Sequence, residues 1–168
     1  MQPTRKPGNL CANLMKRIEV RLSLPAVAPL LDIAKLTADT LHDSLAAPAG
    51  LEQLDPELRA DWKDERQQAQ AGDLQALLAL FDREFFSTGV VAFDEANAEG
   101  VLRATAAVRL RLREKFLSEV PDEQLESGEV DPTALPEPAR RAFLCYVFFG
   151  DLQQLIIQHL ASVILGGE

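Results

Sequence analysis

A long apolar segment near the C-terminus constrains the fold of this chain more than any other feature. Residues 142–165 are long enough to cross a bilayer, since a membrane helix needs about 20 apolar residues. The segment also contains polar side chains that would be unfavourable in hydrocarbon, namely Asp151, Gln153, Gln154, Gln158 and His159. The pattern therefore predicts a buried helix of a soluble protein, from about residue 137 to residue 165. A helix so widely apolar is typical of a core spine or a subunit interface.

Two short segments have the pattern of β-strands. Apolar and polar side chains alternate over residues 16–24, which is the period of a half-buried strand. A lone strand leaves its backbone groups without hydrogen-bond partners. The best partner is the β-branched run at residues 89–93, and we expect the two to pair as a small ribbon.

Four further segments have the apolar spacing of amphipathic helices. Their expected starts carry N-cap or first-turn residues, namely Pro25, Asp55–Pro56, Asp73 and Asp94. The second helix is polar, with Leu58 and Trp62 on one face, and the fourth has apolar residues on two opposite faces, so it should lie centrally. The predicted fold class is mainly α: a single-domain helical bundle of about five helices with a minor two-stranded β ribbon, over residues 16–165.

Charge is unevenly distributed along the chain. With 17 Lys+Arg against 26 Asp+Glu the formal net charge is −9, which argues against a general nucleic-acid binder. Residues 1–15 are predicted to form a flexible basic arm. Residues 119–137 are predicted to form a long acidic loop, and a loop of that length is usually functional or mobile.

No set of residues forms a motif for catalysis or for binding a cofactor or metal. His42 follows Asp39 by one helical turn, as in dimetal bundles, but such sites need a second pair and further carboxylates. Cys145 lies in the apolar segment, where burial raises the thiol pKa and makes it inert. Two cysteines without metal spacing indicate a reducing, cytoplasmic location. We expect no cofactor, no metal and no enzyme activity.

The predicted fourth helix is rich in arginine. Its basic residues do not form one stripe: Arg109 and Arg113 flank one edge of the apolar face, Arg111 and Lys115 flank the other, and Arg103 points away. Flanking arginines usually cover the edge of a core and pair with nearby acids, which the acidic loop supplies. The alternative is a nucleic-acid face that these arginines form together with the basic arm.

Three motifs resemble an uncharacterised bacterial family, a domain of unknown function best represented in actinobacteria. They are a G-x-V-x-F-D-E-x-x-A-E turn at residues 89–99, an L-R-A helix that continues into Arg109 and Leu110, and a Y-x-W-L-x-x-L-Q helix at residues 146–153, where Phe148 replaces the tryptophan. The resemblance covers residues 18–160. It implies no catalytic residue, but it implies genes that often lie beside the adaptor of the Clp protease, and relatives labelled as regulators.

These observations favour a non-catalytic intracellular protein that binds another protein as a regulator or adaptor. The expected partner surface combines the last helix and the acidic loop, with Phe148, Phe149, Glu123, Glu126, Glu129 and Asp131. A two-fold homodimer anchored by the two phenylalanines is also expected, without membrane contact. The alternative function is a transcriptional regulator that binds nucleic acid through the basic arm and the arginines of the fourth helix.

Overall fold

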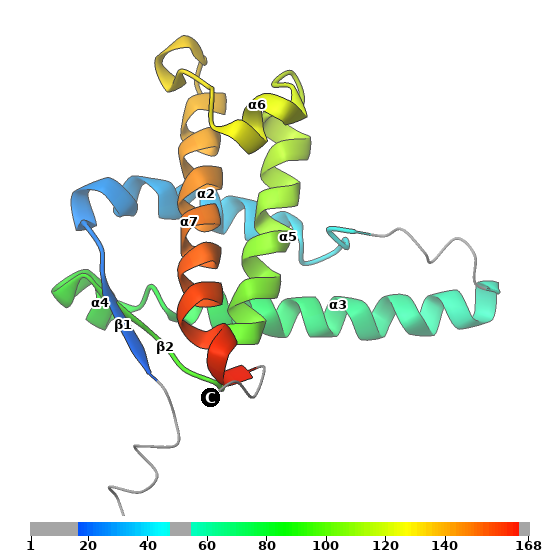
Figure 1. The fold of residues 1–168 in the computed structure, drawn as a ribbon. Helices are drawn as coiled ribbons and strands as arrows, with labels where there is room; N and C mark the ends of the chain where they lie inside the picture. The colour runs from blue at the N-terminus through cyan, green and yellow to red at the C-terminus, as the bar shows by residue number, and fades with distance from the viewer. Residues whose placement is uncertain (1–16, 48–54, 165–168) are drawn as a thin grey trace, which may run out of the picture.

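The computed structural model describes residues 17–47 and 55–164, so the predicted basic arm at residues 1–15 lies outside the described residues. The prediction of a mainly α fold with a minor ribbon is confirmed (Figure 1). In the described part there are four long helices, two short helices, one 3-10 turn and two strands. In chain order they are β1 (Ile18–Arg21), α2 (Leu24–Thr40), α3 (Pro56–Ala79), α4 (Arg83–Thr88), β2 (Val90–Phe93), α5 (Ala98–Phe116), α6 (Asp122–Ser127), η1 (Pro132–Ala134) and α7 (Ala139–Ile164).

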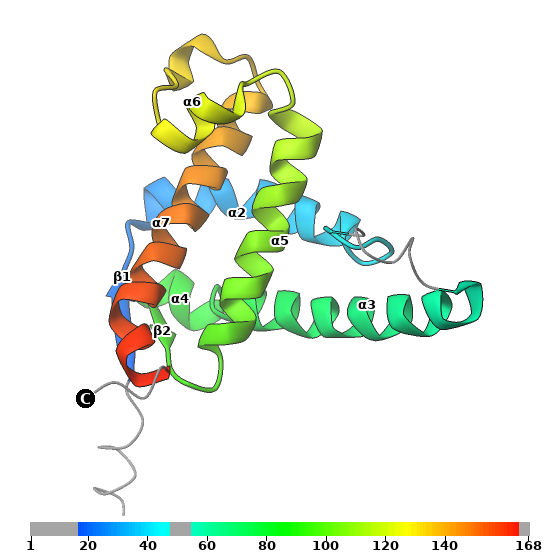
Figure 2. The same cartoon turned by 45° about the vertical axis from the view of Figure 1, so that its right-hand side comes forward.

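Two of the four long helices form an antiparallel pair, and the other two cross it at different levels (Figures 1 and 2). Helices α5 and α7 run side by side in opposite directions, and α2 and α3 cross this pair (Figures 1 and 2). Apolar side chains at helical spacing on α5 and α7 meet at the crossing, because burying them there removes most apolar surface from water. The fully buried side chains at the centre include Phe85, Phe93, Val108, Leu112, Phe149 and Ile156.

Helix α5 occupies the central place that its sequence predicts, but it is covered less completely than expected. It packs against α7, α3 and α2. Of the two residues expected opposite the main stripe, Leu117 is buried while Leu110 is 44% exposed. The second apolar face is therefore covered near the C-terminal end of α5 and open at Leu110.

The predicted strand pairing is confirmed. β1 and β2 form an antiparallel ribbon with the register Ile18↔Phe93, Glu19↔Ala92, Val20↔Val91 and Arg21↔Val90. Gly89 leads into β2 with φ 73°, a left-handed conformation that favours glycine. A Cβ there would lie 2.9 Å from the carbonyl oxygen of Leu22. The close approach of the backbone segments that end β1 and begin β2 therefore also requires a glycine at this position.

The sequence predicts separate helices before and after Asp73, and this is wrong. Helix α3 runs unbroken from Pro56 to Ala79. Asp73 does not cap a helix, because its carboxylate accepts two hydrogen bonds from the Arg103 guanidinium, at 2.9 and 3.0 Å. The chain turns instead after Ala79, and the side chain of Asp82 caps α4 by accepting from the backbone N–H of Phe85 at 3.0 Å.

The segment predicted as a long acidic loop, residues 119–137, contains short elements of secondary structure. This segment contains α6 and η1, and it closes the end of the α5–α7 pair (Figure 1). Leu125 is buried against the core and anchors α6. Asp122 and Glu123 lie in the first turn of α6, where negative charge is favourable. Two acids of this segment therefore stabilise the start of a short helix.

Helix α7 confirms the prediction of a buried helix near the C-terminus, and its ends lie within two residues of the predicted ones. Its inward side includes Ala142, Cys145, Phe149, Leu152 and Ile156, all buried. Within the described ranges, no helix is long and apolar enough to cross a membrane.

Candidate functional site

The acids of the expected partner surface lie at the end of the molecule that α6 forms. Glu123 and Glu126 are exposed on α6, and Glu129 is exposed in the segment after it. Asp131 is also exposed, and its carboxylate accepts from the hydroxyl and the N–H of Thr133 at 2.6 and 3.0 Å. These two hydrogen bonds lower the pKa of Asp131, so this residue stabilises η1 locally.

The two phenylalanines of the expected surface lie elsewhere. Phe149 is 1% exposed, so it belongs to the core and cannot anchor a partner in this conformation, which corrects the expectation. Phe148 is half-buried, and its ring lies 6.4 Å from that of Phe81, just beyond the end of α3. The structure therefore does not join Phe148 and the acids of α6 into one surface, and a two-fold homodimer stays a prediction.

The residues considered for chemistry have no catalytic arrangement around them. Cys145 is buried, and burial raises the pKa of its thiol to about 12, as predicted for an inert core residue. His42 and His159 are both exposed. In residues 17–47 and 55–164, no three His, Cys, Asp or Glu side chains are grouped to hold a metal ion.

The arginines of α5 are engaged within the protein. Arg113 pairs with Asp122 of α6, as the sequence predicts for an arginine beside an acidic segment, and Arg103, which was expected to point away, pairs with Asp73 of α3. The guanidinium of Arg109 donates to the carbonyl of Tyr146 at 3.1 Å and lies 4.0 Å from the centre of that ring. These residues tie α5 to its neighbours and do not form a basic face.

A polar network closes the C-terminal end of α2. Arg111, which is 9% exposed, donates from one amino group to the carbonyl of Thr40 at 3.3 Å and from the other to the carbonyl of Leu45 at 3.2 Å. Gln70 donates to the carbonyls of Leu41 and Ser44 at 2.7 and 3.0 Å. The last carbonyls of a helix have no partner within it. Arg111 and Gln70 supply donors there, which fixes α2 against α3 and α5.

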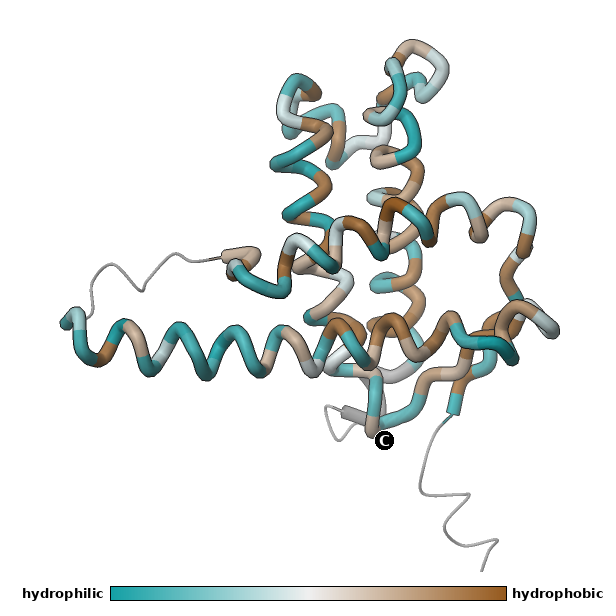
Figure 3. The backbone as a smooth tube through the Cα atoms, turned by 180° about the vertical axis from the view of Figure 1, so that it is seen from behind, coloured by the Kyte–Doolittle hydropathy of each residue, from teal (hydrophilic) through white to brown (hydrophobic). Residues whose placement is uncertain are grey.

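The N-terminal half of α3 contrasts with these packed elements. Residues 56–66 are all exposed, and this half projects away from the other helices (Figures 1 and 2). Figure 3 shows that the projecting part is mostly hydrophilic, with isolated hydrophobic positions. The large apolar side chains Leu58 and Trp62 of this part are 50% and 47% exposed. We call residues 56–66 the α3 arm.

The apolar residues of the α3 arm continue the stripe by which α3 packs on α5. Leu58 and Trp62 share a helix face with Ala69, Asp73 and Ala76, because these positions recur at spacings of three, four and seven. Asp73 pairs with Arg103 of α5, and α5 approaches Ala76 closely at Gly100. The same face is therefore covered by α5 at one end and uncovered at Leu58 and Trp62.

A hollow of about 350 Å³ lies where the α3 arm meets the rest of the protein. Its lining is mostly small and apolar, and it includes Ala46, Ala69, Ala106, Ala107 and the exposed Leu110. Leu58 and Trp62 do not line this hollow but lie further along the same face of α3. We call the hollow, with Leu58 and Trp62 on the α3 arm beyond it, the α3–α5 corner.

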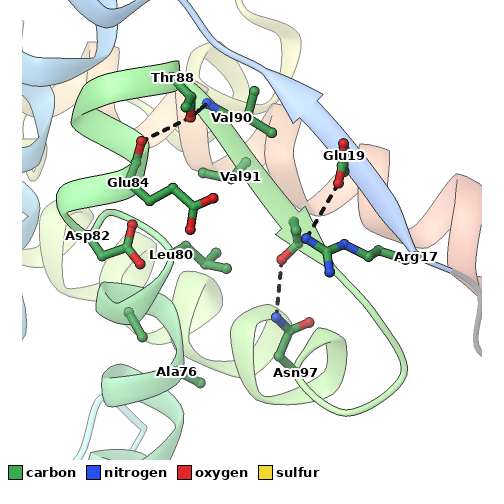
Figure 4. A pocket seen from close by; sticks show the side chains of 12 residues that line it. Arg17, Glu19, Ala76, Leu80, Asp82, Glu84, Thr88, Val90, Val91 and Asn97 are labelled. Carbon is green, nitrogen blue, oxygen red and sulfur yellow. Dashed lines mark hydrogen bonds and ion pairs between the residues drawn. The ribbon is translucent and has the colours of Figure 1, made fainter.

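A second hollow, of about 500 Å³, lies beside β2. The edge of β2 forms one wall, and the end of α3 with the start of α4 forms the other (Figure 4). Three carboxylates (Glu19, Asp82 and Glu84) and one guanidinium (Arg17) line this β2 groove. Sequence reasoning missed the β2 groove, because its walls come from segments whose contacts no local pattern reports.

Comparisons with protein-family models, with curated proteins and with solved structures found no match. The resemblance to the bacterial family therefore stays a prediction that rests on its motifs.

Proposed function

We propose that the protein is a non-catalytic regulator or adaptor that binds a helix of another protein in the α3–α5 corner. The observation that carries this proposal is the exposed continuation of the α5-facing stripe of α3 as Leu58 and Trp62. Aromatic side chains next to a small hollow are typical anchors of protein interfaces. A partner helix that lies along the α3 arm would bury both side chains and could extend to the hollow that Leu110 lines.

The charges of the α3 arm support a binding role. Helical spacing places Arg59, Lys63 and Arg66 along one edge of the apolar stripe, and Asp61 and Glu65 along the other. Like charges four residues apart within each edge disfavour an isolated helix by roughly 0.2–0.5 kcal/mol per pair. A partner that brings acidic groups to Lys63 and Arg66 and basic groups to Asp61 and Glu65 complements the charge of both edges.

The same charges argue against a second copy of this chain as the occupant. Two α3 arms packed antiparallel about a two-fold axis would place each edge against its own equivalent, so like charges would meet. In a parallel arrangement, the second α3 would also have to pack on the part of this face at Asp73 and Ala76, which α5 already covers. The α3–α5 corner therefore favours a different protein, and its helix carries opposite charges on its two edges.

The alternative function, a nucleic-acid-binding regulator, gains no support from α5. Arg103 and Arg113 are paired with carboxylates, and Arg111 is nearly buried at the end of α2. Phosphate contacts require basic side chains that are accessible together. Protein binding is therefore the function that the geometry favours, and we retain the cytoplasm as its location.

Photo-crosslinking in cells tests this proposal. A benzoylphenylalanine in place of Leu58 should capture one partner protein, which is then identified and purified. The same residue in place of Phe86, which is 52% exposed on α4, serves as a control of equal accessibility and should not capture it.

Trp62 then provides a direct measurement, because it is the only tryptophan in the chain. Its emission should shift to shorter wavelength when the identified partner is added, since the indole leaves water. Trp62→Ala should weaken binding by about 30-fold, as for an interface anchor worth about 2 kcal/mol. Capture by the Phe86 position as well, or crosslinks only to further copies of this chain, would contradict the proposal.

A further inference from the structure

We infer that a hollow between α5, α6 and α7 binds a free α-amino acid with an aliphatic side chain. The hollow has a volume of about 350 Å³, which is within the size range of small-molecule sites. None of its lining residues lines the hollow of the α3–α5 corner, so the two sites are separate. We call it the α6–α7 hollow, and the inference does not rest on the proposed function.

Arg109 of α5 lines this hollow and is held there in one orientation. Its Nε donates to the carbonyl of Tyr146 at 3.1 Å, and its Nη1 donates to the side-chain oxygen of Gln153 at 2.9 Å. The guanidinium carbon also lies 4.0 Å from the centre of the Tyr146 ring. These contacts fix the guanidinium before a ligand arrives, which lowers the entropic cost of binding.

The third nitrogen of this guanidinium, Nη2, has unused donors. It has no acceptor within the described ranges, yet it is not buried, so solvent reaches it. Arg103, Arg111 and Arg113 of the same helix each lie beside a carboxylate, whereas Arg109 forms no ion pair with any described residue. A fixed arginine with unused donors is matched to an anionic oxygen. Arg109 therefore provides a binding group for a ligand carboxylate.

Gly150 of α7 keeps Nη2 accessible. A Cβ at this position would lie 3.0 Å from Nη2 and 3.2 Å from the guanidinium carbon, so a larger side chain would cover the group. Gly150 itself lines the α6–α7 hollow. The absence of a side chain here therefore opens Nη2 to a ligand in the hollow.

Two carboxylates at the same hollow determine the charge of the rest of the ligand. Asp151 follows Gly150 on α7, and Glu126 lies on α6; both are exposed, and neither has an ion-pair partner in the part of the chain that the structure describes. Their charges repel a ligand that is only anionic and attract an ammonium group beside its carboxylate. An α-amino acid carries these two charges on neighbouring atoms.

The apolar residues of the α6–α7 hollow indicate the ligand's side chain. Val147 and Ile157 of α7 are 38% and 49% exposed, and Leu125 of α6 lies beside them in the lining. An aliphatic side chain that packs on these residues removes apolar surface from water. Leucine combines such a side chain with the two charges.

An NMR titration of the full chain with L-leucine tests this inference. We expect a dissociation constant on the order of 0.1–1 mM, because a small ligand in an open hollow has little surface to bury. The signals of the Gly150 amide and the Arg109 Nε–H should shift most. The absence of a saturable shift up to about 10 mM leucine would overturn the inference.

Three further probes separate the charges of the ligand. L-Leucinamide lacks the carboxylate and should bind at least about tenfold more weakly, and N-acetyl-L-leucine lacks the ammonium group and should bind about fivefold more weakly. Inorganic phosphate should not displace leucine.

Each of these probes can contradict the inference. Equal binding of leucinamide would show an amine site, and equal binding of N-acetyl-L-leucine would show a site for the C-terminus of a peptide. Displacement by phosphate would show a simple anion site. Any of these results would overturn the inference.

Two variants test the carboxylate contact. Arg109→Gln removes the charge and should weaken leucine binding at least about tenfold. Gly150→Ala adds the Cβ beside Nη2 and should weaken binding to a similar degree, whereas Gly72→Ala, on the exposed surface of α3, should not. Circular dichroism checks that the variants are folded.

Three exposed acids test the ammonium contact without altering the α5–α7 interface. Asp151→Asn and Glu126→Gln should each weaken leucine binding several-fold. Glu123→Gln should not, since Glu123 is exposed on α6 but does not line the hollow. Equal losses for Glu126→Gln and Glu123→Gln would overturn the inference. Trp62→Ala should bind leucine normally, which separates failure here from failure of the proposed function.

Discussion

The α3 arm and the α5–α7 pair are both regular helices, yet different forces hold them. Along the α5–α7 interface Val108, Leu112, Phe149 and Ile156 are fully buried, and Arg109 bonds across it to Tyr146. Along the α3 arm every side chain is exposed. Burial therefore stabilises the first region, whereas the second depends on its continuity with the packed half of α3.

This difference separates the structural residues from the residues available for binding. Helices in proteins gain most of their stability from tertiary packing of an amphipathic face. An apolar stripe that lies beyond the reach of its own core, as at Leu58 and Trp62, adds little to folding. Matched substitutions in the two regions should make this contrast measurable.

The largest expected difference in the free energy of unfolding is between substitutions of two aromatic residues, one in each region. Phe149→Ala should destabilise the protein by about 3–5 kcal/mol, because it leaves a cavity in the core of α7. Trp62→Ala should change the free energy of unfolding by less than about 0.5 kcal/mol, since Trp62 is 47% exposed and lies outside the buried core. Urea unfolding followed by circular dichroism measures both. Similar losses would show that the α3 arm is packed in solution.

A smaller contrast is expected between two arginines. Arg111→Met keeps most of the side-chain volume but removes the donors to the carbonyls of Thr40 and Leu45. Leaving these groups without Arg111 should destabilise the protein by about 1–3 kcal/mol. Arg66→Met in the α3 arm should stay within about 0.5 kcal/mol of the wild type. If the two variants unfold at the same denaturant concentration, Arg111 does not fix the end of α2.

Sequence periodicity predicted the elements whose local pattern agrees with their tertiary environment. Alternation identified β1, and a wide apolar sector identified α7. Prediction failed where a residue type is suited both to capping a helix and to forming an ion pair between helices. Asp73 has the chemistry of an N-cap, but its partner is Arg103, which lies 30 positions later in the sequence. Helix α3 is therefore continuous where the sequence suggested a break.

The candidate sites were less predictable than the fold. The face shared by Leu58 and Trp62 follows from helical spacing, but its exposure depends on where α5 ends its contact with α3. The β2 groove depends on Thr88 and Asn97, which bond two edge groups of β2 and leave two others open. No local sequence pattern indicates such hydrogen bonds. Helical spacing also misplaced Phe149, which was expected at a partner surface but lies in the core.

The smallest expected contrast is between two glycines within helices. Glycine inside a helix is less favourable than alanine by roughly 0.5–1 kcal/mol, so Gly→Ala stabilises a helix wherever there is room. Gly72 of α3 is exposed, and a Cβ there would have no atom within 4 Å, so Gly72→Ala should raise the free energy of unfolding by that amount. Gly150 of α7 faces Arg109, and a Cβ there would lie 3.0 Å from one guanidinium nitrogen.

Gly150→Ala should therefore lose this gain or destabilise the protein, because Arg109 must leave its bonds to Tyr146 and Gln153. Thermal unfolding of both variants, with Arg109→Met added to Gly150→Ala, measures the effect. In the Arg109→Met background the alanine should become favourable, since the unbranched methionine side chain can move away from it. A gain at Gly150 as large as that at Gly72 in the wild-type background would show that Arg109 is not held at the α5–α7 interface.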